Sequence, residues 1–302
     1  MTPAIDQVEQ QTVTPAVSDD ALVTPGTLTV ALDTSDAPQA MQGADGNLTG
    51  YAVDAARALA CRMGLKVAFV DASSADSALG DKKADIFIGD IHNAGDDVNS
   101  LGTCLYDAAA VFGKTGDGES LNVSTETLNT ATLGVQTSSA SQEALAKQSV
   151  TANQKTFSNI NECFEALESG EVDYVVCDST AGGYLARLMN GISYVGTLET
   201  PSTLGVAGLA SNDTLCSAVS DALDGITADG TLEAVHSVWY GQMPYDLTTK
   251  AISGADVQSS SSGSASADAA DSSSDTASES SESKSSSQEG TITDDDINKL
   301  NS

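Results

Sequence analysis

The chain has 302 residues, of which 43 are acidic and only 12 are Lys or Arg, so its formal net charge is -31 at neutral pH. A protein that binds nucleic acid or an anionic membrane surface must neutralise phosphates, and this charge balance excludes both roles. No apolar run approaches the roughly 20 residues that a membrane-spanning helix needs. The 40% of apolar residues are enough for a hydrophobic core in one large domain or two lobes.

The composition divides the chain into three parts. Residues 1–25 show no hydrophobic period and are predicted to be a flexible, disordered leader. Residues 247–302 are rich in Ser, Ala and acidic residues, contain no aromatic residue and are predicted to be disordered. No apolar signal core follows Met1, so either the protein is cytoplasmic or its export segment is absent from this chain.

Residues 26–246 alternate between apolar runs and amphipathic stretches, which predicts strands alternating with helices. In the first half we expect strands at 27–32, 65–70 and 84–89, helices at 51–63 and 74–81, and a turn or short hairpin at 43–50. In the second half we expect strands at 131–136 and 172–176, helices from 142 and at 159–167, and a helical segment at 215–239 that breaks at Asp229-Gly230. The pattern predicts an α/β fold in which each of two lobes has its own sheet.

The five cysteines are an odd number, so at least one thiol is free or pairs between chains. No C-x-x-C pair is present, which disfavours a zinc knuckle and a thioredoxin-like site. Cys163 and Cys177 flank a helix-to-strand connection, and a disulfide between them is a hypothesis.

Four segments together resemble one known family. Residues 45–54 (DGNLTGYAVD) resemble a D-G-x-L-x-G-F-D-V-D motif at the start of a helix, and residues 82–86 (KKADI) resemble its K-x-D-A strand start. Residues 170–178 resemble G-x-V-D-A-x-x-x-D, and residues 228–241 resemble a D-G-T-x…K-W-F-G ending. In this order and spacing, they resemble the amino-acid-binding branch, family 3, of the bacterial extracellular solute-binding proteins, which serve ABC transporters.

The resemblance covers residues 26–246 and implies a two-lobed periplasmic-binding-protein-like fold of type II. Lobe 1 would hold residues 27–108 and 207–246, and lobe 2 would hold residues 109–206. Two crossing strands, near residues 106–112 and 204–209, would form the hinge, and ligand in the cleft would close it.

The same resemblance implies a monomeric receptor that delivers an amino acid or an amine to an ABC permease, with no cofactor and no metal. It also implies an extracellular or periplasmic location, with membrane anchoring through a lipidated N-terminus that this chain lacks.

The family's clamp for the ligand α-carboxylate is altered here. Relatives carry an Arg in a T-x-x-R run after the third strand, where this chain reads Ala94-Gly95-Asp96-Asp97. A carboxylate at Asp97 repels a carboxylate instead of pairing with it. The chain has only three arginines, at positions 57, 62 and 187, and none replaces the clamp. The first loop, residues 34–39, also lacks the family's aromatic residues.

In lobe 2 the family's G-T-T nest corresponds to Ser138-Ser139-Ala140, which keeps a hydroxyl beside a helix N-terminus. Asp178 matches the residue that holds the ligand α-amino group. The candidate ligand-binding residues are therefore Asp33, Asp36, Asp90, His92, Asp97, Ser138, Ser139 and Asp178.

Several carboxylates without an arginine favour a cationic ligand, although acidic residues are common throughout this chain. A divalent metal on Asp90, His92 and Asp97 is an alternative, but metal sites need three or four convergent ligands and a lone His beside Asp is typical of a solvated loop.

Three functional hypotheses remain from the sequence. The first is a solute-binding receptor of an ABC importer. The second is a sensory or surface module that keeps the fold with a decayed ligand site. The third is an enzyme resembling the dehydratases of this fold that act on cyclohexadienyl compounds. An anionic substrate of that kind needs cationic anchors that this chain lacks, so we expect no enzymatic activity.

Overall fold

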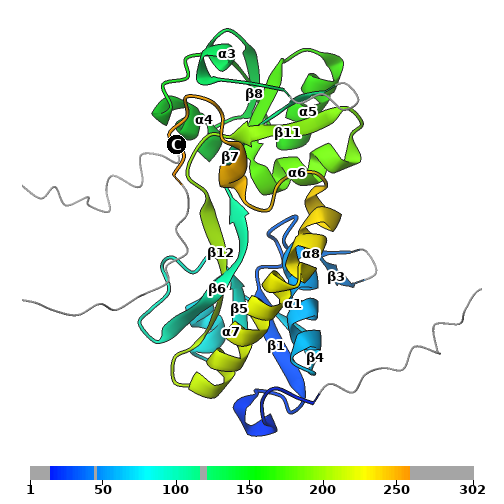
Figure 1. Cartoon of the computed structure of the whole chain (residues 1–302), viewed down its shortest axis with the longest axis vertical. Coiled ribbons are helices and arrows are strands. Elements are labelled where there is room, and N and C mark those ends of the chain that lie inside the picture. The colour runs from blue at the N-terminus through cyan, green and yellow to red at the C-terminus, as the bar shows by residue number, and fades with distance from the viewer. Residues whose placement is uncertain (1–13, 44–45, 116–120, 259–302) are drawn as a thin grey trace, which may run out of the picture. The chain divides into compact units, whose positions relative to one another are not determined.

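The computed structural model describes residues 14–43, 46–115 and 121–258, and they form two five-stranded sheets with helices packed against them (Figure 1). We call each sheet with its helices a lobe. The first sheet has the strand order β4-β1-β5-β12-β6. Its strands are β1 (Thr27–Leu32), β4 (Lys66–Asp71), β5 (Ile86–Gly89), β6 (Val98–Asp107) and β12 (Ser202–Leu209). β1 pairs in parallel with β4 and β5, whereas β12 runs antiparallel to β5 and β6.

The second sheet has the order β11-β7-β10-β8-β9. Its strands are β7 (Ala109–Lys114), β8 (Thr132–Gln136), β9 (Asn153–Phe157), β10 (Tyr174–Asp178) and β11 (Ile192–Thr197). β8 runs parallel to β9 and β10, and β7 is antiparallel to β10 and β11. Mixed sheets with helical crossovers confirm the predicted type II α/β architecture.

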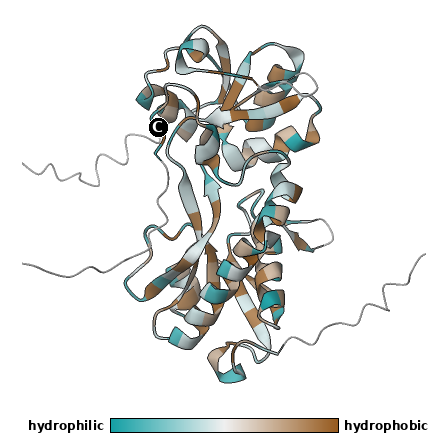
Figure 2. Cartoon of the chain, viewed as in Figure 1, coloured by the Kyte–Doolittle hydropathy of each residue, from teal (hydrophilic) through white to brown (hydrophobic). Residues whose placement is uncertain are grey.

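The helices divide between the two sheets. Those on the first are α1 (Tyr51–Arg62), α2 (Ala75–Leu79), α7 (Asp213–Ala228) and α8 (Thr231–Tyr240). The second lobe has α3 (Thr125–Asn129), α4 (Ala140–Lys147), α5 (Ile160–Ser169) and α6 (Ser179–Leu188). A small hairpin pairs β2 (Met41–Gln42) with β3 (Leu48–Thr49), and the short 3₁₀ turns are Asp19–Ala21 and Leu247–Lys250. Apolar residues are concentrated on the strands, and the helices alternate apolar and polar faces (Figure 2).

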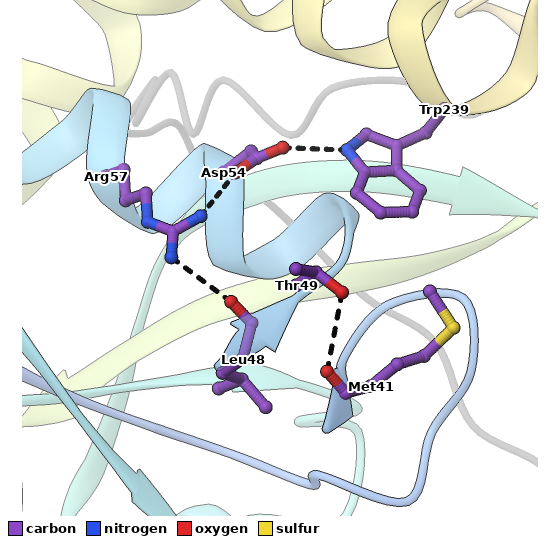
Figure 3. Close-up of polar contacts among 6 residues, drawn as sticks. All are labelled: Met41, Leu48, Thr49, Asp54, Arg57 and Trp239. Atoms are coloured by element: carbon purple, nitrogen blue, oxygen red, sulfur yellow. Dashed lines mark hydrogen bonds and ion pairs between the residues drawn. The ribbon is translucent and has the colours of Figure 1, made fainter. Parts of the chain in front are cut away.

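Helix α1 is held at its start and along its first half. Gly50 precedes it at φ 146°, where an added Cβ would lie 2.1 Å from the carbonyl oxygen of Gln39, so only glycine fits. Along the helix, Asp54 accepts hydrogen bonds from Arg57 at 2.8 Å and from the indole nitrogen of Trp239 at 2.9 Å (Figure 3). These contacts join the helix that follows the D-G-x-L-x-G segment to helix α8.

The chain crosses between the sheets at Ala108 and again at residues 198–201, next to the predicted hinge positions. The two crossings lie side by side, because the Leu198 amide donates to the Ala109 carbonyl at 2.8 Å. β12 pairs within the first sheet over its whole length, so residues 202–206, expected in the second lobe, belong to the first sheet.

A third connection between the lobes follows helix α8 and was not predicted. Residues 241–258 run along the second sheet, and Leu247 and Ile252 bury their side chains there. The Ile252 amide donates to the Thr197 carbonyl at 2.8 Å. The predicted disorder is therefore wrong for residues 247–258, because these two apolar side chains anchor the segment; residues 259–302 lie outside the described residues.

Part of the expected leader also packs against the first lobe. Val17 and Leu22 are buried, and the Ala16 amide donates to the Met63 carbonyl at 2.9 Å. The Val23 amide donates to the carboxylate of Asp85 at 2.7 Å. These contacts contradict a flexible leader over residues 16–25, whereas residues 1–13 lie outside the described residues.

All five cysteines are described as free thiols, so the hypothesis of a disulfide between Cys163 and Cys177 is wrong. Both side chains are buried in the core between β10 and α5. Within the described part of the chain, no helix is both long enough and apolar enough to span a bilayer.

Candidate ligand-binding cleft

A cavity of about 330 Å³ opens at the carboxyl ends of β1 and β5, beside the strand crossing. Asp33, Asp36 and Asp90 line it together with the apolar side chains of Phe87 and Leu204. Parallel strands that end at the same edge of a sheet bring their following loops together, which is why Asp33 and Asp90 meet there. Three of the predicted site residues thus share one cavity.

Asp178 belongs to the second lobe and is not among the residues that line the cavity, but its charge acts on Asp36. It ends strand β10 and immediately precedes helix α6. Burial first, and then the charges of Asp33 and Asp178, raise the pKa of Asp36. The carboxyl groups of Asp36 and Asp178 therefore interact from opposite lobes.

The pKa of Asp178 is raised to about 6. Part of the residue is exposed to solvent, but the surrounding protein desolvates its carboxyl group, and the charges of Asp107 and Glu199 add to the effect. A carboxyl group with this pKa is partly protonated near neutral pH, which is a common property of binding and catalytic sites.

Asp107, which the sequence analysis missed, ends strand β6 at the first crossing. Its carboxylate accepts hydrogen bonds from the Ser179 hydroxyl at 2.6 Å, the Ala108 amide at 3.0 Å and the Thr180 amide at 3.1 Å. It thereby satisfies free amide groups at the start of helix α6. Burial nevertheless raises its pKa.

Glu199, also missed, lies at the second crossing and accepts a hydrogen bond from the Ala109 amide at 3.0 Å. Asp107 ends the strand before the first crossing, Glu199 lies within the second crossing, and both add negative charge beside Asp178. An acidic residue within the first predicted crossing, residues 106–112, is the signal that could have identified Asp107, whereas Glu199 lies outside the second, residues 204–209.

His92 lies beside Asp90 instead of lining the cavity. The Asp90 carboxylate accepts a hydrogen bond from the His92 amide at 2.9 Å and lies 2.7 Å from the Nδ1 atom of its ring. These bonds lower the pKa of Asp90. Both side chains are exposed, as expected for a loop turn.

Asp97, Ser138 and Ser139 are not joined to this group by any contact that the structure describes. Asp97 is exposed, and its carbonyl oxygen accepts a hydrogen bond from the Ala210 amide at 2.8 Å. Ser138 has φ 55° and donates its amide to the Gln142 side chain at 2.8 Å. The Ser139 hydroxyl, at the start of α4, is buried without a partner.

No Lys or Arg is among the described residues that line the cavity. Over the described ranges, no group of three or more His, Cys, Asp or Glu side chains is arranged to hold a metal ion. The charged groups of this site are thus carboxylates. A ligand group that complements them is a cation with hydrogen-bond donors.

Two α/β lobes, joined by crossing strands and with a polar cavity beside the crossing, define the class of two-lobed solute receptors with the type II periplasmic binding fold. A family model, bacterial extracellular solute-binding proteins, family 3, matches residues 28–95. This match covers part of the first lobe and agrees with the resemblance that the sequence motifs indicate.

Known relatives agree with this assignment. The L-cystine-binding protein TcyJ of Escherichia coli K12 is 25% identical over 221 residues, which are 72% of this chain and 83% of the relative. A solved ancestral cationic amino acid solute-binding protein is 28% identical with a TM-score of 0.59, covering 71% of this chain and 96% of its own.

The fold is also that of the L-cystine solute receptor of Neisseria gonorrhoeae in its unliganded open conformation. That structure has a TM-score of 0.60 and 20% identity, and the match covers 72% of this chain and 93% of the receptor.

Proposed function

We propose that this protein is the solute-binding receptor of an ABC importer and that its ligand is a cationic amine bound between Asp36 and Asp178. The observation that carries the proposal is a cavity lined by Asp33, Asp36 and Asp90 with no cationic side chain among its described lining residues, and the charge of Asp178 acts on Asp36 from the opposite lobe.

The electrostatics support a cationic ligand. Burial and neighbouring negative charges raise the pKa values of both Asp36 and Asp178, so the ionised site is under mutual repulsion. An ammonium group between them would replace this repulsion with charge-assisted hydrogen bonds. Because the two residues come from different lobes, such a ligand would favour the closed state over the open one.

The structure favours an amine without a carboxylate over an ordinary amino acid. No arginine lines the cavity among the described residues, and Arg57 and Arg62 form ion pairs with Asp54 and Asp229. A ligand carboxylate would meet further carboxylates in this cavity. Diamines and other amines lacking a carboxylate are therefore the preferred ligand class.

The relatives support the transport role. Those reported above are named as amino-acid-binding proteins or receptors, and the ancestral protein is named as a binder of cationic amino acids. We propose the corresponding non-enzymatic role here, outside the cytoplasmic membrane, with an ABC permease as the partner that accepts the ligand. We further propose that the protein is a monomer, held at the membrane by a lipidated N-terminus.

A thermal-shift screen of the whole chain tests the proposal. The panel holds diamines, polyamines, quaternary amines, common amino acids and divalent metal chlorides. A ligand at 100 times its Kd stabilises a protein by about 2.7 kcal/mol. Stabilisation confined to amines supports the proposal. Stabilisation by neutral amino acids alone refutes the preferred ligand class, and a folded sample that responds to nothing favours a sensory or surface module.

A further inference from the structure

A second cavity, of about 560 Å³, lies in the other lobe and shares no lining residue with the carboxylate cavity. Its walls come from strands β7 and β11, helix α6 and the segment after helix α8, which Figure 1 shows crossing this part of the lobe in orange. The volume lies within the range of small-molecule pockets, about 300–1,000 Å³. Neither the family motifs nor the proposed transport ligand accounts for this cavity.

Two cationic side chains, Arg187 and Lys250, line the cavity. All three arginines of the chain are described, and two of them are ion-paired: Arg57 with Asp54 at 2.8 Å and Arg62 with Asp229 at 2.6 Å. Among the described residues, no hydrogen bond or ion pair involves the guanidinium group of Arg187. In a chain with 43 acidic residues and 12 basic ones, an arginine without a carboxylate is unusual.

Lys250 is held in place by Tyr194 and, among the described residues, forms no ion pair with a carboxylate. Its ammonium group donates a hydrogen bond to the Tyr194 carbonyl at 3.2 Å and lies 5.7 Å from the centroid of the same tyrosine ring. A carbonyl and a ring face stabilise an ammonium group but leave its positive charge uncompensated. The side chain is therefore preorganised to meet an anion.

The remaining walls are largely apolar. Phe112 and Tyr194 pack edge to face with their ring centroids 5.9 Å apart, and Met243 is buried beside helix α6. A mostly apolar wall with a few converging polar groups is typical of sites for small organic ligands.

We propose that this cavity binds a small organic oxyanion, a carboxylate or phosphate carried on an aromatic or aliphatic body. The guanidinium group of Arg187 matches the two oxygens of such a group, Lys250 adds a second charge, and the apolar walls take the body. A positive pocket on an otherwise acidic protein concentrates small anions locally. The site uses none of residues 116–120, which lie outside the described residues.

An anion bound in this cavity would contact two parts of the chain at once. Lys250 and Met243 belong to the segment that follows helix α8, whereas Arg187 and Phe112 belong to the second lobe. The bound anion would thus stabilise the packing of residues 241–258 against helix α6 and strand β7. The proposal does not depend on the ligand of the carboxylate cavity.

The test measures binding of phenylacetate and phenyl phosphate to the full chain by calorimetry and by ligand-observed NMR. Benzyl alcohol and phenylacetamide are neutral counterparts of similar shape, and neither carries the ammonium group proposed to bind the carboxylate cavity. We expect at least one anion to bind and both counterparts to bind at least tenfold more weakly. The tighter anion identifies carboxylate or phosphate as the preferred group. Failure of both anions to bind, or equal binding of benzyl alcohol, overturns the proposal.

Variants that keep or remove a positive charge test whether the anion binds in this cavity. Arg187→Gln and Lys250→Gln are each expected to weaken anion binding tenfold or more, whereas Lys250→Arg keeps it within about threefold. Lys147→Gln removes the same charge from helix α4, outside the cavity, and is expected to leave binding unchanged. Loss of binding in Lys147→Gln equal to that in Arg187→Gln would show a non-specific charge effect and contradict the site. Unfolding temperatures confirm that each variant is folded.

Discussion

Burial raises the pKa of Asp36, in the loop after strand β1, and the charges of Asp33 and of Asp178, at the start of helix α6, raise it further. Asp36 and Asp178 lie in different lobes and are far apart in the sequence. Their approach places like charges at the point where the two lobes meet. The site therefore carries stored repulsion that a cationic ligand would relieve, and this relationship yields the first two predictions.

Replacing Asp178 with Asn should abolish amine binding and at the same time stabilise the free protein. The folded-state pKa of Asp178 is about 6, above the ordinary 3.8, so its ionised form is disfavoured by folding at pH 8. We expect a loss of about 2–5 kcal/mol in amine affinity. We also expect the unfolding temperature of the ligand-free protein to rise by a few degrees at pH 8 but much less at pH 3.5, where the carboxyl group is mostly protonated in both states.

The matched control is Glu165→Gln, which removes one exposed negative charge from helix α5 in the same lobe. It should change neither amine affinity nor the unfolding temperature beyond the error of measurement. If Asp178→Asn binds amines as tightly as the unaltered protein, the assignment of Asp178 to the site is wrong.

Amine affinity should depend on pH through Asp178. Above pH 6 its carboxylate is ionised and pairs with an ammonium group, whereas below pH 6 the pairing costs a proton. For one linked proton, affinity is expected to fall about tenfold between pH 8 and pH 5. Calorimetric titration of a diamine at several pH values measures this, with release of protons near pH 6. A flat profile would mean that Asp178 does not titrate in the site.

His236 should make the fold sensitive to acid. Its ring is buried among Tyr51, Tyr240 and Tyr245, and burial lowers its pKa to about 4. The unfolded chain, with an ordinary pKa of 6.5, takes up the proton first as pH falls, so stability is lost between pH 6.5 and pH 4. The full loss is about 3 kcal/mol.

The variant His236→Phe keeps an aromatic ring without a titrating group. The raised pKa values of Asp36 and Asp178 act in the opposite direction over part of this range, but they are common to both proteins. The difference in free energy of unfolding between the two proteins, measured by urea denaturation at pH 7.5 and pH 4.5, therefore isolates His236. An identical pH dependence in both would contradict a neutral buried histidine.

Gly182 lets helix α6 approach strand β7. An added Cβ would lie 2.2 Å from Cε2 of Phe112 and 2.7 Å from the Cys177 sulfur. Alanine favours the helix by about 1 kcal/mol over glycine, but the overpacking outweighs this gain, and we expect Gly182→Ala to lose about 1–2 kcal/mol. Urea denaturation of Gly182→Ala, Phe112→Leu and the double variant measures the coupling. Strictly additive effects would show that the predicted clash does not form.

Local patterns were sufficient to predict much of the fold. The helical stripe that begins at Tyr51 and the break at Asp229-Gly230 are both confirmed, since α7 ends at Ala228 and α8 begins at Thr231. The carboxyl ends of β1 and β5 also bring Asp33 and Asp90 to one cavity, as parallel pairing predicts.

The remaining features depend on contacts that no local pattern encodes. Helix α6 was missed because Gly182 and Gly183 lower its helical propensity, and its packing on Phe112 requires them. Asp107 is recognisable as part of the acidic group only after β6 and α6 are placed together. Likewise, Val17 and Ile252 find apolar partners only in the folded chain.

The central claim is that the carboxylate cavity selects an amine without a carboxylate. The most direct test is calorimetric titration of the full chain at pH 8 with two ligand pairs, agmatine against arginine and cadaverine against lysine. The members of each pair differ only in the α-carboxylate. We predict tighter binding of the decarboxylated member in at least one pair, by tenfold or more. Tighter binding of arginine or lysine would contradict the account, since it would require a carboxylate clamp in the cleft.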